Sequence, residues 1–141
     1  MARVLVVDDE FQVLALIKKY LQSEHEVFTA EYARDALDLY QRELPSVVIS
    51  DIRMPDIDGV ELMKKIKRMG RDVEVILMTG HADIRTAIEA LRLGASDYLV
   101  KPIDVNSLVE AIETALYKTH QKERIIGLIG KMMHGEQGEG R

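Results

Sequence analysis

The sequence of 141 residues contains no cysteine and no tryptophan, and aromatic residues make up only 5% of it. Without cysteine, the chain cannot form a disulfide scaffold, a thiolate metal site or a thiol nucleophile. With so few aromatic residues, the core must consist of aliphatic side chains, and the hydrophobic fraction of 47% is ordinary for a globular protein. The length fits one domain with a short surplus.

Two further absences narrow the class of protein. No apolar stretch approaches the roughly 18 residues that indicate a membrane-spanning helix, and the apolar run at residues 4–7 is too short for a secretion signal. Acidic residues outnumber basic ones by 24 to 19, which gives a formal net charge of -5 and argues against non-specific binding of nucleic acid. We therefore expect a cytoplasmic protein in which this chain contacts neither membrane nor nucleic acid directly.

Short apolar runs alternate with helical patterns along the chain. Runs that are apolar on both faces are typical of central strands in a parallel sheet covered by helices. They occupy residues 4–7, 47–49, 75–78 and 98–100, and a weaker alternating run occupies 26–30. Between the runs, apolar residues recur at helical spacing. The fourth helical stripe, for example, consists of Ile84, Ala87, Ile88 and Leu91.

The pattern predicts five strands alternating with five helices. The fold class is therefore α/β, a three-layer sandwich of flavodoxin-like type with a parallel five-stranded sheet of strand order 2-1-3-4-5. We expect residues 1–118 to form this domain. Residues 119–141 should form a helical extension that ends in a disordered Gly-rich tail.

Polar residues stand where the predicted strands end. They are Asp8, Asp9 and Glu10 after the first strand, Ser50 and Asp51 after the third, Thr79 after the fourth and Lys101 after the fifth. In a parallel sheet these ends form one edge, beyond which ligands bind. Adjacent carboxylates need a cation, and Mg²⁺ suits them. A carboxylate can also act as a nucleophile and form an aspartyl-phosphate, whose oxygens a lysine and a hydroxyl would stabilise.

These residues lie in four motifs with informative order and spacing. The motifs are VLVVDDE at 4–10, DIRMPDIDG at 51–59, MTGHA at 78–82 and YLVKP at 98–102. Together they resemble the receiver domain of two-component response regulators, over about residues 3–118. The segment 78–102 is most similar to receivers of the nitrogen-regulator type, which precede an ATPase and a DNA-binding domain.

The resemblance implies a role for each matching residue. Asp51 would accept a phosphoryl group from the phosphohistidine of a sensor histidine kinase. Asp9, Asp51 and the backbone carbonyl of Arg53 would bind Mg²⁺ directly, and Asp8 would act mainly through a water molecule. Lys101 would pair first with Asp51 and then with the phosphoryl group.

Further residues would shape the site and transmit its state. Thr79 would be the switch hydroxyl, drawn toward a phosphoryl oxygen, and Tyr98 the aromatic residue that turns inward with it. The peptide bond before Pro102 is often cis in this family, which would aim the lysine. Pro55 and Gly59 would shape the loop that follows the acceptor.

Arg53 and His81 carry a separate hypothesis. They stand two residues after the acceptor and two after the switch hydroxyl, and in this family such positions influence the attack of water on the phosphorylated state. We hypothesise that the two side chains set the lifetime of that state. The alternative is that both are ordinary exposed side chains.

Three functions compete. The first is a phosphorylation-dependent switch, not an enzyme apart from its own phosphorylation and slow autodephosphorylation, that controls an output domain or a downstream protein. The second is a phosphatase of the haloacid dehalogenase class, which requires an acid where this chain has Arg53. The third is a receiver-like interaction module that works without phosphorylation. A homodimer, through the face from the fourth strand to the fifth helix or through the C-terminal helix, is a further expectation.

Overall fold

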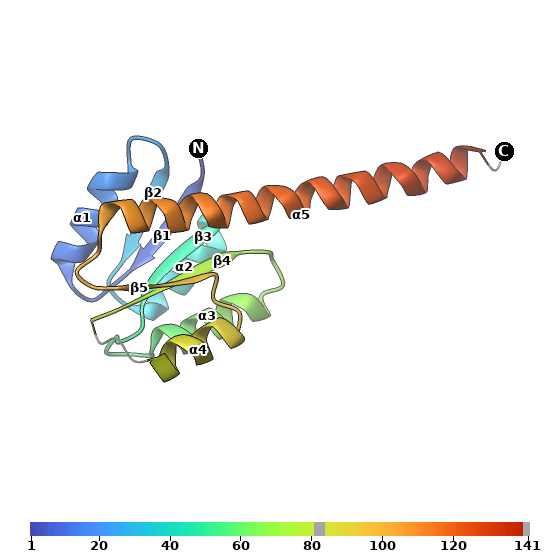
Figure 1. Ribbon diagram of the computed structural model, residues 1–141. Helices are drawn as coiled ribbons and strands as arrows, with labels where there is room; N and C mark the ends of the chain where they lie inside the picture. The colour runs from blue at the N-terminus through green and yellow to red at the C-terminus, as the bar shows by residue number, and fades with distance from the viewer. Residues whose placement is uncertain (81–83, 140–141) are drawn as a thin grey trace.

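A computed structural model describes residues 1–80 and 84–139 of the chain. The five strands pair in parallel and form one sheet of order β2-β1-β3-β4-β5, as the sequence predicts (Figure 1). Their bounds are β1 Arg3–Val7, β2 Glu26–Ala30, β3 Val47–Asp51, β4 Glu74–Thr79 and β5 Asp97–Val100. The strands therefore lie where the apolar runs predict them, with one or two residues added at some ends.

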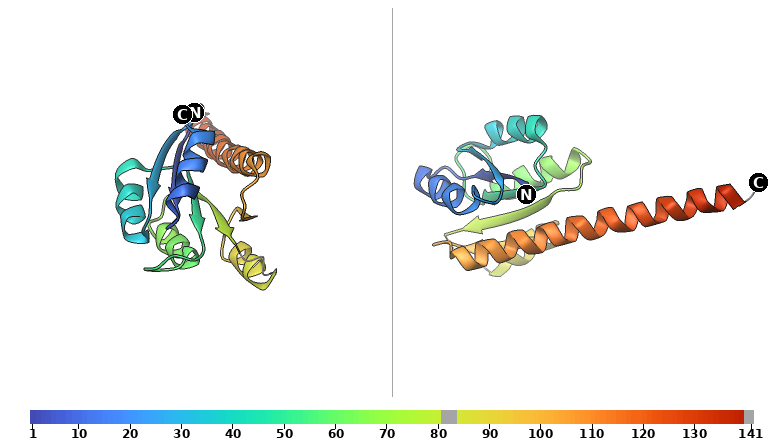
Figure 2. Two further views of the ribbon diagram at one scale, coloured as in Figure 1. Left: turned by 90° about the vertical axis from the view of Figure 1, so that its left-hand side faces the viewer. Right: turned by 90° about the horizontal axis from the view of Figure 1, so that it is seen from above.

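Five helices cover the two faces of this sheet. Their bounds are α1 Phe11–Leu21, α2 Ala33–Glu43, α3 Gly59–Arg68, α4 Ile84–Arg92 and α5 Val105–Glu139. Helices α1 and α5 pack on one face, and α2 and α3 pack on the other, with α4 beside α3 (Figure 2). The result is the predicted three-layer sandwich of flavodoxin-like type.

The packing of β1, an interior strand of the sheet, explains why its run at residues 4–7 contains no polar residue. Val4 and Val6 pack with α1 and α5, whereas Leu5 and Val7 pack with α2 and α3. All four side chains are fully buried. Because successive residues of a strand point to opposite faces, a strand covered on both sides must be apolar throughout.

Helix α4 leaves much of its apolar stripe uncovered. Ile84, Ile88 and Leu91 are 78%, 46% and 48% exposed. Ala90 is the residue that α4 buries. The helix lies over β5, an edge strand of four residues, so the sheet offers it little surface to cover.

Helix α5 extends well beyond the sheet. Its first part buries Leu108, Ala111, Ile112 and Ala115, and its second part projects away from the domain (Figure 1). It continues without a break past residue 118, so the predicted boundary there stays a prediction, and it includes residues 134–139, for which the sequence predicts disorder. Helix α5 is long, but no helix in the described part of the chain is both long and apolar enough to cross a membrane.

Candidate functional site

The carboxyl ends of β1 and β3 bring four acids together. Asp8, Asp9, Glu10 and Asp51 each place one carboxylate oxygen within 4.8 Å of the others. Asp8 and Asp51 are buried, whereas Asp9 and Glu10 are exposed. The strand register explains the cluster: Val7 pairs with Ser50 in the neighbouring parallel strand, so the acids that follow these two residues lie side by side.

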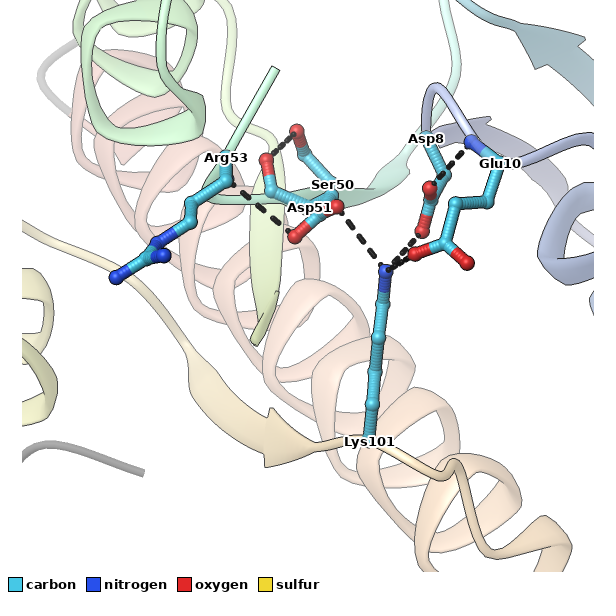
Figure 3. A network of polar contacts seen from close by, with 6 residues as sticks. All are labelled: Asp8, Glu10, Ser50, Asp51, Arg53 and Lys101. Atoms are coloured by element: carbon cyan, nitrogen blue, oxygen red, sulfur yellow. Dashed lines mark hydrogen bonds and ion pairs between the residues drawn. The ribbon is translucent and has the colours of Figure 1, made fainter. Parts of the chain in front are cut away.

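Lys101 is the cation among these acids. Its Nζ lies 2.7 Å from Asp8 Oδ2, 3.0 Å from Asp51 Oδ2 and 3.3 Å from Glu10 Oε1 (Figure 3). The lysine side chain is only 13% exposed, and it reaches the acids from the loop after β5. One ammonium group thus pairs with carboxylates at the carboxyl ends of two different strands, β1 and β3.

The electrostatics of the site follow from this arrangement. Burial works against the charged form of Lys101, but hydrogen bonds and attraction from Asp8 and Asp51 outweigh it and hold the pKa of the lysine well above its usual range. Burial raises the pKa of the Asp8 carboxyl, and its bonds to Lys101 and to the Glu10 N–H offset this only in part. Four carboxylates face one ammonium, so the cluster fits a further divalent cation.

Several hydrogen bonds fix the backbone around Asp51. The Ser50 hydroxyl donates to the Asp51 carbonyl at 2.9 Å, and the Arg53 N–H donates to Asp51 Oδ1 at 3.3 Å. Gly59, at the start of α3, donates its N–H to the Ile52 carbonyl at 2.7 Å. A Cβ at Gly59 would lie 2.2 Å from the Asp51 carbonyl oxygen. Only glycine fits there, which gives a physical reason for the predicted loop-shaping role.

The other predicted residues lie around this edge. Thr79 is buried at the end of β4, one residue beyond Met78, the strand partner of Asp51. Its carbonyl accepts the Lys101 N–H at 2.7 Å. Pro102 follows a cis peptide bond, as the resemblance predicts.

Tyr98 lies on β5, and Pro55 lies in the loop between β3 and α3. The Tyr98 ring is half-buried and packs against the core on the α2 and α3 side. Its hydroxyl is buried and has no hydrogen-bond partner among the described residues. Pro55 is exposed in the loop ahead of α3.

The two residues of the lifetime hypothesis remain apart from the cluster. Arg53 is exposed, and its guanidinium points away from the carboxylates (Figure 3). His81 lies outside the described residues. The hypothesis that these side chains set a lifetime therefore stays a prediction.

Sequence reasoning missed two contacts. Glu10 pairs with Lys101, a partnership that its place directly after Asp8 and Asp9 could have suggested. Asp56 accepts the Arg34 N–H at 3.1 Å and so caps α2 from another loop. Slight burial acts to raise the pKa of the Asp56 carboxyl, but backbone hydrogen bonds outweigh it and lower that pKa.

Residues 4–113 match the response regulator receiver domain family. The chain belongs to that family. It is 40% identical over 122 residues to the DNA-binding transcriptional regulator NtrC of Proteus hauseri, covering 86% of this chain and 25% of that protein. It is 39% identical over 124 residues to the regulatory protein AtoC of Escherichia coli, covering 87% and 27%. The receiver thus spans about a quarter of these curated relatives, and its nitrogen-regulator likeness is confirmed.

Solved structures agree with this assignment. The signal receiver domain of a putative LuxO repressor protein from Vibrio parahaemolyticus superposes with a TM-score of 0.83 at 29% identity, covering 88% of this chain and 96% of that one. NtrX from Brucella abortus, in complex with ADP, also gives 0.83, at 35% identity over 88% of this chain and 29% of that one. Receivers are phosphoacceptor switches of two-component systems, in general not enzymes, that bind Mg²⁺ at an acidic pocket.

Proposed function

We propose that this receiver is a phosphorylation-dependent switch in which Asp51 accepts a phosphoryl group from the phosphohistidine of a sensor histidine kinase. One observation carries the proposal. The Asp51 carboxylate, at 5% exposure, lies at the carboxyl edge of the sheet with Lys101 Nζ 3.0 Å away and three more acids around it. A surplus of negative charge beside a buried carboxylate suits a site that takes up a cation and a phosphoryl group.

The transfer exchanges one bond for another. A carboxylate oxygen of Asp51 attacks phosphorus, a P–O bond forms, and the P–N bond to the kinase histidine breaks. The imidazole keeps the electron pair of that bond and takes up a proton. When bound, Mg²⁺ supplies positive charge to the attacking and phosphoryl oxygens. Asp8, Asp9, Asp51 and the Arg53 carbonyl would hold it.

Lys101 and Thr79 change their contacts when Asp51 is phosphorylated. Lys101 exchanges its contact with the Asp51 carboxylate for one with the phosphoryl group, and the Thr79 hydroxyl moves toward another phosphoryl oxygen. Tyr98 turns further inward as Thr79 moves. The phosphoryl group thereby favours one of two conformations through contacts that the unmodified chain lacks. Arg53 and His81 tune slow autodephosphorylation.

The output lies beyond this domain. We propose that the receiver controls an output domain or a downstream protein of a cytoplasmic transcriptional regulator, as its likeness to NtrC and AtoC suggests. A homodimer would use the exposed apolar residues of α4 and β5 or those of distal α5, such as Ile126 and Ile129. Sedimentation of Ile88→Glu and Ile126→Glu chains distinguishes the two surfaces, because only the variant on the true interface loses the dimer.

Intact mass spectrometry with acetyl phosphate and Mg²⁺ tests the acceptor. The wild-type chain should gain one phosphoryl group. Asp51→Asn should gain none, and the matched control Asp35→Asn, an exposed acid on α2, should behave as wild type. A wild-type chain that stays unmodified would instead favour an interaction module that works without phosphorylation.

A further inference from the structure

A second charged cluster lies at the opposite, amino edge of the sheet. Glu74, the first residue of β4, is 7% exposed. Its Oε2 accepts the Ser96 hydroxyl, and its Oε1 lies 3.4 Å from Lys122 Nζ on α5. Asp72 Oδ1 adds a weaker contact to the same ammonium group at 3.6 Å. These residues come from three segments that are far apart in the sequence.

Because Glu74 is buried, its carboxylate depends on its partners for stability. A buried carboxylate is costly unless it is paired and hydrogen-bonded. Here one oxygen has a hydroxyl donor and the other has an ammonium group. Ser96 is itself held in place, because its N–H donates to the Val75 carbonyl at 2.7 Å. Lys122 thus pairs with a carboxylate whose position is set by β4.

Lys122 stands where α5 leaves the domain. Ala115, two turns earlier, is buried against the sheet, whereas every residue from Glu123 to Ile129 is exposed. The helix continues for 17 residues from Glu123 to Glu139, which is roughly 25 Å at 1.5 Å per residue. A tilt of about 10° at Lys122 would move that end by roughly 4 Å. A small change at this position is therefore amplified along the projecting helix (Figure 2).

We propose that Glu74, Ser96 and Lys122 form an anchor that fixes the direction in which the distal half of α5 leaves the receiver. The anchor goes beyond the phosphoacceptor function and does not depend on it. Its consequence is that a segment joined to α5, or a second copy paired with it, meets the receiver in one orientation.

The absence of cysteine allows a direct test. Spin labels are placed at Gln41→Cys on α2 and Lys131→Cys on α5, both exposed positions. Pulsed electron paramagnetic resonance then measures the distance between them in the whole chain, diluted with unlabelled protein so that pairs within one molecule dominate. The parent should give one narrow distribution, and the Lys122→Gln and Glu74→Gln variants should at least double its width or shift its mean.

Two matched variants separate the anchor from general charge effects. Arg124→Gln removes one positive charge from an exposed position on the same helix and should leave the distribution unchanged, and Lys122→Arg should keep it narrow. Circular dichroism checks that α5 remains helical. If Glu74→Gln does not fold, the distance distribution of Lys122→Gln, a change at an exposed position, tests the proposal alone. An unchanged distribution in folded Lys122→Gln, or an equal change in Arg124→Gln, overturns the proposal.

Discussion

The two edges of the sheet each hold a lysine among acids, but the balance of charge differs. At the carboxyl edge, Lys101 lies within 3.3 Å of three carboxylates, and Asp9 belongs to the same cluster. At the amino edge, Lys122 Nζ lies 3.4 Å from Glu74 and 3.6 Å from Asp72, and the Ser96 hydroxyl donates to the buried Glu74 carboxylate. The first cluster has four acids, two of them buried, around one ammonium group, whereas the second has two acids, of which Glu74 is buried and paired and Asp72 is exposed.

This difference separates a site from a structural contact. A satisfied buried carboxylate has no need of a ligand, so the amino edge holds elements together. Close carboxylates of which two are buried repel one another, and this repulsion favours a further cation or raised pKa values. The burial that raises the pKa of Asp8 shows this tension within the protein. Two buried carboxylates beside one ammonium group thus distinguish the carboxyl edge, because the amino edge buries Glu74 and leaves Asp72 exposed.

The largest expected contrast comes from removing each lysine. Lys101→Met leaves Asp8 and Asp51 buried without their ammonium partner, and we expect a loss of about 3 kcal/mol in the free energy of unfolding. Lys122→Met removes a partner whose side chain is 51% exposed, for a loss of about 1 kcal/mol. Urea unfolding without Mg²⁺ measures both. Equal losses would contradict the contrast between the edges.

Added Mg²⁺ should stabilise the chain through the carboxyl edge alone. A ligand at 100 times its dissociation constant raises the free energy of unfolding by about 2.7 kcal/mol. Asp9→Asn should lose most of this gain, whereas Asp72→Asn, at the amino edge, should keep it. Thermal unfolding with and without Mg²⁺ provides the measurement, and a full gain in Asp9→Asn would remove that acid from the metal site.

A glycine pair tests how closely the acceptor is held. Gly59→Ala brings a methyl group against the Asp51 carbonyl, and we expect a loss of about 2 kcal/mol together with slower phosphoryl uptake. Gly80→Ala, at the same edge, meets no atom within 4 Å and should change stability little. The rate of modification by acetyl phosphate, followed by mass, measures the effect on Asp51. Wild-type rates in Gly59→Ala would show that the loop tolerates the displacement.

The smallest effect concerns Asp8 and has an unusual sign. Burial raises the pKa of Asp8 above its ordinary value of 3.8 in the folded chain, so the folded state binds the proton more tightly. The stability that this group contributes is present below 3.8 and is lost as pH rises through the folded-state pKa. Asp8→Asn should therefore raise the free energy of unfolding at neutral pH. Urea unfolding across pH without Mg²⁺ tests this, since a destabilised variant at pH 7 would contradict it.

The sequence was sufficient for the sheet and for the core of the site. Unbroken apolar runs locate the buried strands, and parallel strands place their carboxyl ends at one edge, so Asp8, Asp51, Thr79 and Lys101 could be expected together. The close approach of Gly59 to Asp51 agrees with the motif that contains both. These features depend on local pattern and on a topology with few alternatives.

Other contacts depend on packing that local pattern does not encode. Glu74 and Ser96 are 22 positions apart, and Glu74 and Lys122 are 48 apart, and nothing in their neighbours marks them as partners. Helix periodicity predicts an apolar stripe on α4 but not whether the sheet is wide enough to cover it, so the exposure of Ile88 could not be derived from the sequence pattern. The same limit applies to Asp56, whose role depends on where α2 begins.

Mapping the phosphoryl group tests the central claim most directly. The chain is treated with acetyl phosphate and Mg²⁺, and borohydride then reduces the acyl phosphate so that a modified aspartate becomes homoserine. Peptide mass spectrometry identifies the converted residue. The account predicts homoserine at Asp51 alone, and reduction of another acid of the cluster to its alcohol, or no reduced residue at all, would contradict it.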